Sequence, residues 1–152
     1  MYHKSVLIMT KFPDPKYPDP RDLQLQRVIN AVACSLYNAG YCPRIAKSPH
    51  HDWLWDNVEL YLLGCGLGVA ILEDKYKPEL NPNVALEWGW MKGMCKPILF
   101  LEETDFGMSR ADWSGLISDK FNWDNPEADV KSAVLKFIGA RSAEVPEDVI
   151  FS

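Results

Sequence analysis

Apolar residues follow two alternating patterns along the chain. Short, continuous apolar runs that are rich in β-branched residues are typical of strands buried on both faces. Between these runs, longer segments carry apolar residues at the spacing of an amphipathic helix. The predicted strands are residues 5–10, 43–47, 69–72, 97–101 and 121–123, and the predicted helices are residues 22–38, 56–63, 82–94 and a last helix that begins at 125–126. A further helical turn is predicted at 110–113.

Polar and turn-forming residues mark the ends of the predicted helices. Asp22, Asp56 and Asn81 are predicted N-caps, because short polar side chains accept hydrogen bonds from the first free amides of a helix. Pro82 directly after Asn81 fits the first helical position, where the missing N–H costs nothing. Gly40 is the predicted C′ residue that ends the first helix.

Strand and helix alternate five times, which predicts a parallel sheet with helices on both faces. We therefore expect an α/β protein, a flavodoxin-like three-layer sandwich whose five-stranded parallel sheet has the order 2-1-3-4-5. Residues 1–142 form a single domain in this interpretation, and residues 143–152 form a C-terminal tail. Ligands of such sheets bind outside the carboxyl ends of the first and third strands. The loops 11–21 and 73–82 then frame the expected crevice.

Composition and charge restrict the class of protein. The 152 residues carry a net charge of −5, with 47% hydrophobic and 24% charged residues, as in an ordinary soluble domain. The acidic balance argues against a nucleic-acid-binding protein. No apolar run approaches the roughly 20 residues that span a bilayer, so we expect no membrane contact and a cytoplasmic location. The four cysteines and the pair His50-His51 lack the spacing of a metal site, and no metal is expected.

The segment 81–100 contains the candidate chemistry. Glu87 lies about one and a half turns into the predicted helix, and Asn83 and Trp90 share its face. The predicted core face of this helix consists of Val84, Trp88 and Met91. Packing therefore does not require Glu87, and its side chain is free to point towards the crevice. The alternative is that Glu87 is an ordinary solvated helix residue.

The same segment resembles a known superfamily. The sequence Asn-Pro-Asn-Val-x-x-Glu-x-Gly at 81–89, followed by Gly-x-x-Lys-Pro and an apolar strand, is similar to the TIR-like and nucleoside 2-deoxyribosyltransferase-like superfamily. Its bacterial members include stand-alone nucleotide-binding TIR-like proteins of antiviral defence. Residues 9–18, 31–46 and 58–73 resemble the elements that precede this motif in the family. The chain departs from the family at Trp88 and Trp90 and in a longer loop at 75–80, which leaves the shape of the pocket open.

The resemblance implies that Glu87 serves the cleavage of an N-glycosidic bond, as nucleophile or as stabiliser of the cationic sugar. A carboxylate suits this role because breaking the C1′–N bond builds positive charge on the ribose. Charge and position suggest phosphate contacts for the cations of the first-strand loop and a ribose diol contact at the end of the third strand. Each of these candidates has a structural alternative, in which the cations of the loop are simply solvated charges, Asn81 is only the N-cap of its helix, and Glu73 only marks where the third strand meets solvent. The candidate nucleotide-binding residues are Thr10, Lys11, Phe12, Arg21, Glu73, Asn81, Asn83 and Trp90.

We therefore expect an N-glycosidase that cleaves the ribose C1′–N bond of NAD or of a related nucleotide or nucleoside, without a cofactor. The alternative is a non-catalytic nucleotide sensor or effector of a bacterial defence or signalling system that acts by self-association. The six tryptophans, several in segments typical of a surface, together with the assembly that the resemblance implies, predict a homo-oligomer. A phospho-acceptor receiver domain would need an acidic pair directly after the first strand, and the residues Met9-Thr-Lys-Phe12 offer none. A flavodoxin would need a Ser/Thr/Gly-rich phosphate loop there, and the loop is proline-rich instead.

Overall fold

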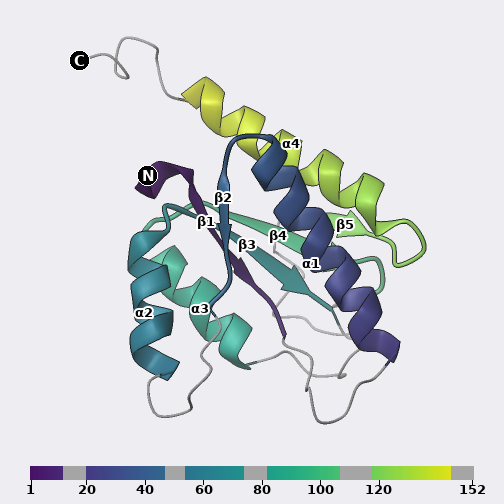
Figure 1. Cartoon of the computed structure of the whole chain (residues 1–152), viewed down its shortest axis with the longest axis horizontal. Helices are drawn as coiled ribbons and strands as arrows, with labels where there is room; N and C mark the ends of the chain where they lie inside the picture. The colour runs from purple at the N-terminus through teal and green to yellow at the C-terminus, as the bar shows by residue number, and fades with distance from the viewer. Residues whose placement is uncertain (12–19, 47–53, 74–81, 107–117, 145–152) are drawn as a thin grey trace.

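The computed structural model describes residues 1–11, 20–46, 54–73, 82–106 and 118–144 (Figure 1). A short 3-10 turn, η1 (Tyr2–Lys4), precedes the first strand. The strands are β1 (Ser5–Met9), β2 (Cys42–Arg44), β3 (Leu67–Leu72), β4 (Ile98–Glu103) and β5 (Asp119–Phe121). The helices are α1 (Pro20–Asn38), α2 (Leu54–Gly64), α3 (Pro82–Gly93) and α4 (Pro126–Glu144).

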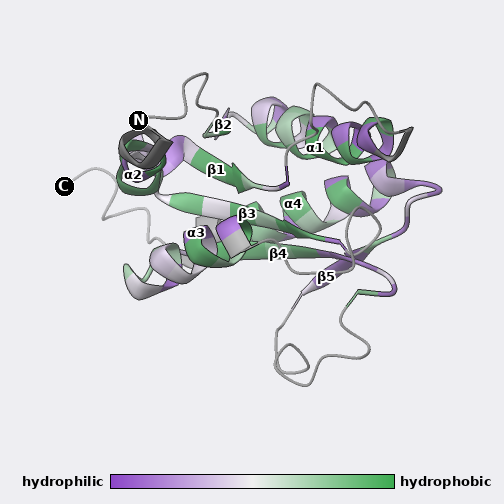
Figure 2. Ribbon diagram, turned by 90° about the horizontal axis from the view of Figure 1, so that it is seen from below, coloured by the Kyte–Doolittle hydropathy of each residue, from purple (hydrophilic) through white to green (hydrophobic). Residues whose placement is uncertain are grey.

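The five strands form one parallel sheet in the order β2-β1-β3-β4-β5, as the alternation of strand and helix predicted. β3 is the central strand, and its Val69 pairs with Ile8 of β1 on one side and with Leu99 of β4 on the other. The residues of β1 and β3 are all buried, because helices cover both faces of the sheet. Figure 2 shows β1 and β4 as mostly hydrophobic ribbons, whereas hydrophobic and hydrophilic residues alternate along α1.

Two hydrophobic clusters lie on opposite faces of the sheet. One cluster joins the sheet to α1 and α4, with Val28, Val32 and Val134 fully buried. The other joins it to α2 and α3, with Leu62 and Met91 fully buried. Successive side chains of a strand point to opposite faces, so each buried strand contributes to both clusters. The three-layer arrangement therefore follows from the continuous apolar runs of the sequence.

Close packing at Gly68 fixes the distance between α3 and the sheet. A Cβ atom at this position of β3 would lie 2.7 Å from the sulfur of Met91 in α3 and 2.8 Å from the terminal methyl of Met9 in β1. The missing side chain lets Met91 reach the surface of the sheet. α3, the helix that carries Glu87, is thereby held directly against β3.

Two helices end in the same way but with different residues. In α1, the amide of Tyr41 donates to the carbonyl of Leu36, and Gly40 adopts a φ of 81°. This Schellman geometry confirms Gly40 as the C′ residue. At the end of α3, the amide of Lys96 donates to the carbonyl of Met91, and the C′ position is occupied by Cys95 with a φ of 57°. A left-handed backbone favours glycine, so Cys95 adopts an unfavourable conformation.

Several predicted boundaries are wrong, and local chemistry explains most of the differences. α1 begins at Pro20 and not at Asp22, because proline suits the first turn of a helix. α2 begins at Leu54, so Asp56 lies inside the helix and the predicted N-cap at this position is wrong. α4 extends to Glu144, and the division into a domain of residues 1–142 and a C-terminal tail stays a prediction.

The ends of several strands also differ from the prediction. β1 ends at Met9, so Thr10 follows the strand, and β2 is confined to Cys42–Arg44 at the edge of the sheet. β4 extends to Glu103 because the polar residues at its end find partners next to β5, as described below. β5 covers Asp119–Phe121, so Trp123 lies after the strand. The turn predicted at 110–113 and the tail from residue 145 onwards lie outside the described residues.

Candidate functional site

The carboxyl ends of β1 and β3 meet where the strand order reverses, and two charged residues are joined there. Lys11 follows β1 and Glu73 follows β3. The Lys11 Nζ lies 2.9 Å from Oε1 of Glu73 and donates a hydrogen bond of 2.8 Å to the Glu73 carbonyl oxygen. Lys11 is 7% exposed and Glu73 is 2% exposed, so neither is a solvated loop charge. The structure thus places a buried ion pair at the base of the expected crevice.

The other candidates from the loops are only partly described. Thr10 is buried, and its hydroxyl lies 3.2 Å from the carbonyl oxygen of Lys11. Phe12 and Asn81 lie outside the described residues, and so does the side chain of Arg21 at the start of α1. The role of these three residues in nucleotide binding stays a prediction.

α3 begins at this same edge of the sheet and carries Glu87 (Figure 1). Val84 and Met91 are buried against the sheet, and Trp88 makes an edge-to-face contact with Phe100 of β4 at a centroid distance of 5.5 Å. This confirms the predicted core face of the helix. Glu87 lies beside that face and is half-buried, whereas Asn83 and Trp90 on the same side of the helix are exposed.

Burial changes the acid–base chemistry of Glu87. Loss of water around the side chain raises the pKa of its carboxyl to about 7, because burial disfavours the charged form. No residue that the structure describes makes a hydrogen bond or ion pair with this carboxylate. At neutral pH Glu87 is therefore divided between its protonated and ionised forms. A carboxyl group in this state can accept a proton, donate one, or stabilise a developing positive charge.

Two further buried carboxylates lie at the end of β4, and the sequence analysis missed both. Glu102 accepts a hydrogen bond from the hydroxyl of Ser118 and lies 3.0 Å from the Lys120 ammonium. Glu103 accepts a hydrogen bond from the indole N–H of Trp123. The sequence did contain a signal for these buried carboxylates, because the two glutamates directly follow the apolar run 97–101. Ser118, Lys120 and Trp123 come from the segment around β5, so these contacts attach the short edge strand to the sheet.

No group of three or more His, Cys, Asp or Glu side chains within the described ranges is arranged to hold a metal ion. The cysteines at 34, 42, 65 and 95 are all free thiols. Burial raises the pKa of the Cys65 thiol, which keeps it in the less reactive neutral form. Within the described helices, none is long and apolar enough to cross a bilayer.

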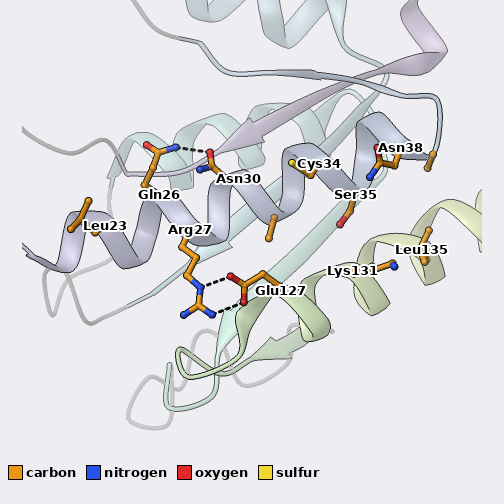
Figure 3. Close-up of a pocket in the computed structure, with 12 residues that line it drawn as sticks. Leu23, Gln26, Arg27, Asn30, Cys34, Ser35, Asn38, Glu127, Lys131 and Leu135 are labelled. Carbon is orange, nitrogen blue, oxygen red and sulfur yellow. Dashed lines mark hydrogen bonds and ion pairs between the residues drawn. The ribbon is translucent and has the colours of Figure 1, made fainter.

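A separate groove lies between α1 and α4, on the face of the sheet opposite to α3 (Figure 3). Its volume is about 720 Å³. Arg27 of α1 holds Glu127 of α4 across it with two hydrogen bonds, one of them 2.8 Å long between Nη2 and Oε2. Its lining also includes small and polar residues such as Asn30 and Cys34, together with the apolar side chains of Leu23 and Leu135. The groove is remote from α3 and contains none of the predicted site residues.

Comparison with solved structures identifies the fold. A structure of the Clostridium botulinum CMP N-glycosidase BcmB matches with a TM-score of 0.52 and 17% sequence identity over 78% of this chain and 86% of that chain. A 2-deoxyribosyltransferase from Leishmania mexicana matches with a TM-score of 0.50 and 17% identity over 65% of this chain and 64% of that chain. Neither a protein-family model nor a curated protein matches the sequence. The chain therefore shares the nucleoside 2-deoxyribosyltransferase-like fold with these two structures.

Proposed function

We propose that the protein is an N-glycosidase that cleaves the C1′–N bond of a nucleotide or nucleoside, with Glu87 as its catalytic carboxylate. The observation that carries this proposal is Glu87 itself, a half-buried carboxyl that no described residue pairs with and whose pKa is raised to about 7. A residue with a merely structural role at this position would be expected to be solvated or paired. Strongly shifted pKa values are enriched at functional sites.

The proposed reaction uses the negative charge of Glu87. When the C1′–N bond breaks, the base leaves with the bonding electron pair and positive charge develops on C1′ and the ring oxygen. An ionised Glu87 close to the sugar stabilises this charge or forms a bond to C1′, after which water or another acceptor takes the sugar. Partial burial of Glu87 lowers the local dielectric constant, which strengthens the attraction between carboxylate and cation.

The remaining candidates bind the substrate in this proposal. Asn83 and Trp90 lie on the same side of α3 as Glu87 and provide an amide and an aromatic surface to the substrate. We propose that the Lys11–Glu73 pair, at the ends of β1 and β3, contacts the ribose of the substrate. The sequence resemblance led us to NAD, and one structural neighbour is a CMP N-glycosidase. We therefore propose a substrate class that includes NAD and pyrimidine nucleotides.

Replacement of Glu87 tests the proposal. We expect Glu87→Gln to reduce cleavage at pH 8 by about 100-fold or more, because the amide keeps the shape of the side chain but removes its charge. Substrate binding should persist in this variant. Cleavage of NAD, CMP and their nucleosides is followed by chromatography of the released base, and binding by calorimetry.

Glu127→Gln is the matched control, since Glu127 is an exposed helix glutamate on the opposite face of the sheet. This control should cleave within about 2-fold of the wild type, as expected for a surface substitution. Equal cleavage by the wild type and Glu87→Gln would refute the catalytic role of Glu87.

A second candidate function is a nucleotide sensor that responds by self-association. The exposed apolar side chains of Leu60 and Leu63 in α2 and of Leu86 in α3 favour this candidate. The same assays separate the two functions: a sensor binds a nucleotide without releasing the base, and Glu87→Gln then changes affinity alone.

A further inference from the structure

The amino-terminal edge of the sheet carries positive charge, although the chain as a whole has a net charge of −5. Lys4 directly precedes β1, Lys96 lies shortly before β4, and Lys92 is in the last turn of α3, which ends at this edge. The last turns of α1, α2 and α3 contain no Asp or Glu. Among the described residues, Lys4 and Lys92 are exposed and form no ion pair.

Two of these lysines are fixed in place next to exposed apolar side chains. The Lys4 Nζ lies 4.3 Å from the centroid of the Tyr41 ring. The Lys96 Nζ lies 5.1 Å from the centroid of the Tyr2 ring, and it donates a hydrogen bond of 3.3 Å to the carbonyl of Leu63. Tyr2 is 42% exposed and Leu63 is 60% exposed. We call Tyr2, Lys4, Leu63 and Lys96 the amino-edge surface.

The short turn that carries Tyr2 and Lys4 is part of the folded edge. The amide of Gly66, just before β3, donates a hydrogen bond of 3.2 Å to the Tyr2 carbonyl. A Cβ atom at Gly66 would lie 3.1 Å from that carbonyl oxygen and 3.2 Å from the Tyr2 ring. This close approach holds the turn against the start of β3. The amino-edge surface therefore has a defined shape, which a binding segment requires.

The chain returns to this edge after α4. Because α4 follows β5 and runs back along a parallel sheet, it ends at the amino-terminal edge. Figure 1 shows the yellow end of α4 and the purple start of the chain at the upper left of the molecule. The next eight residues, 145–152, lie outside the described residues, and their sequence is Val-Pro-Glu-Asp-Val-Ile-Phe-Ser.

The composition of this segment is complementary to the amino-edge surface. Glu147 and Asp148 are opposite in charge to the lysines, and opposite charges across a contact select the correct partner. The residues Val149-Ile150-Phe151 that follow are all large and apolar, as are the exposed parts of Tyr2 and Leu63. Seven extended residues span about 23–25 Å. Neighbouring strands are about 4.8 Å apart, so β4 and β1, which flank β3, are separated by about 10 Å and lie within reach of the segment.

We propose that residues 145–151 bind the amino-edge surface of their own chain, with the acidic pair next to Lys4 and Lys96 and the apolar residues on Tyr2 and Leu63. The covalent link to α4 favours this contact over one between copies, because a short tether gives a high effective concentration. The candidate site lies at the opposite, carboxyl-terminal edge of the sheet and stays open when the segment binds. The proposal does not depend on the proposed activity.

Crosslinking of the full chain with a zero-length carbodiimide tests the contact directly, because this reagent joins an amine to a carboxylate only where the two groups touch. We expect mass spectrometry of the digested protein to show a link between Lys4 and Glu147 or Asp148. Lys136 and Asp119 provide the internal control, since their Nζ and Oδ1 atoms are 3.3 Å apart and exposed.

Two crosslinking results would overturn the proposal. One is the absence of the Lys4 link in a sample that contains the Lys136–Asp119 link. The other is a link from the acidic pair to Lys131, which would place the segment in the groove between α1 and α4. A mixture of ¹⁴N- and ¹⁵N-labelled protein shows whether the link forms within one chain. A link that forms only between labelled and unlabelled chains counts against the proposal.

Hydrogen exchange of full-length variants provides a second test that needs no chemical modification. Glu147→Lys/Asp148→Lys should accelerate amide exchange at residues 2–5 and at Gly66 by at least about 3-fold, because repulsion then opens the contact. Asp105→Lys/Asp124→Lys is the matched control, with the same change in charge at two exposed residues outside the amino-edge surface. This control should leave the exchange of those amides unchanged. Circular dichroism confirms that each variant is folded, and equal exchange in the two double variants would refute the proposal.

Discussion

Glu87 and Lys11 show two ways in which this chain places charge in partly dry surroundings. Lys11 is nearly inaccessible, but its ammonium group is 2.9 Å from the Glu73 carboxylate. Glu87 is less buried, and no described residue compensates its charge. Burial therefore raises the pKa of the Glu87 carboxyl to about 7. Of the two arrangements, the ion pair joins the ends of β1 and β3, and the carboxyl without a described partner is the one suited to chemistry.

The raised pKa of Glu87 predicts how stability depends on pH. The folded protein holds a proton at Glu87 up to about pH 7, whereas the unfolded chain releases it near the ordinary pKa of 4.5. The stabilising contribution is complete below pH 4.5 and is lost as the pH rises through 7. Between pH 5 and pH 8 we expect Glu87 to lower the free energy of unfolding by on the order of 1–2 kcal/mol.

Urea denaturation of the wild type and Glu87→Gln measures this effect. The difference in unfolding free energy between the two proteins should change with pH, and the variant should be the more stable protein at pH 8. We do not expect Glu127→Gln to become more stable than the wild type at pH 8, because hydrogen bonding to Arg27 lowers the pKa of Glu127. A pH-independent difference between wild type and Glu87→Gln would contradict the raised pKa.

The Lys11–Glu73 pair predicts a strong asymmetry between single and double substitutions. Lys11→Met should destabilise the protein by about 3 kcal/mol or more, because it removes the ammonium group 2.9 Å from the buried Glu73 carboxylate. The double variant Lys11→Met/Glu73→Gln should recover a substantial part of that loss, since no uncompensated charge remains. Denaturant melts of the single and double variants test this. Equal stability of Lys11→Met and wild type would show that the pair carries little energy.

At the level of elements, helix ends reveal where the chain accepts unfavourable backbone geometry. α1 and α3 both end in Schellman motifs, but only α1 has the glycine that this geometry favours. The residue after Cys95 is Lys96, whose ammonium donates hydrogen bonds to the carbonyls of Leu62, Leu63 and Cys65 at the end of α2. The turn after α3 thus places a cation at the negative end of α2. The sharp reversal at Cys95 serves the packing of two helices.

The unfavourable φ at Cys95 predicts a stabilising substitution. Cys95→Gly should raise the free energy of unfolding by about 1 kcal/mol, because glycine adopts the left-handed backbone without steric cost. Cys95→Ala is the control for loss of the thiol and should leave stability within about 0.5 kcal/mol of the wild type. Gly40→Ala should have the opposite sign and cost about 1 kcal/mol. Urea denaturation distinguishes these outcomes, and a destabilised Cys95→Gly variant would contradict the argument.

At the scale of the whole molecule, the sheet separates two hydrophobic clusters, one on each of its faces. Leu7 and Met9 contribute to the α2–α3 side, while Val6 and Ile8 of the same strand contribute to the α1–α4 side. Loss of either cluster exposes one face of every central strand. The two faces are therefore coupled through the backbone of β1, β3 and β4.

This coupling predicts that residues 1–142 unfold as a single domain. We expect one transition in urea, with the same midpoint in far-ultraviolet circular dichroism and in tryptophan fluorescence. Met91→Ala on one face and Leu36→Ala on the other should each cost about 2–5 kcal/mol and shift both signals together. Two separated transitions, each sensitive to only one of the variants, would indicate that the faces fold independently.

The sequence by itself determined the fold, because hydrophobic periodicity is a local property of the chain. Continuous apolar runs such as 69–72 predicted buried parallel strands, and Val84, Trp88 and Met91 predicted the core face of α3. Gly40 was identified as a helix end because its conformation depends on its immediate neighbours. The helix pattern placed Glu87 beside a predicted core face, and the family resemblance supplied its proposed catalytic role. The local pattern predicted some element boundaries wrongly, such as the start of α2 at Asp56, because packing decides how far a helix extends.

Only the tertiary structure decided which distant charges meet. Lys11 and Glu73 are 62 positions apart, and their pairing depends on β1 and β3 being neighbours in the sheet. The contacts of Glu102 and Glu103 depend in the same way on where β5 lies. Burial of Glu87, and therefore its raised pKa, follows from the depth at which α3 packs on the sheet. These properties depend on distances between elements, which the order of residues does not contain.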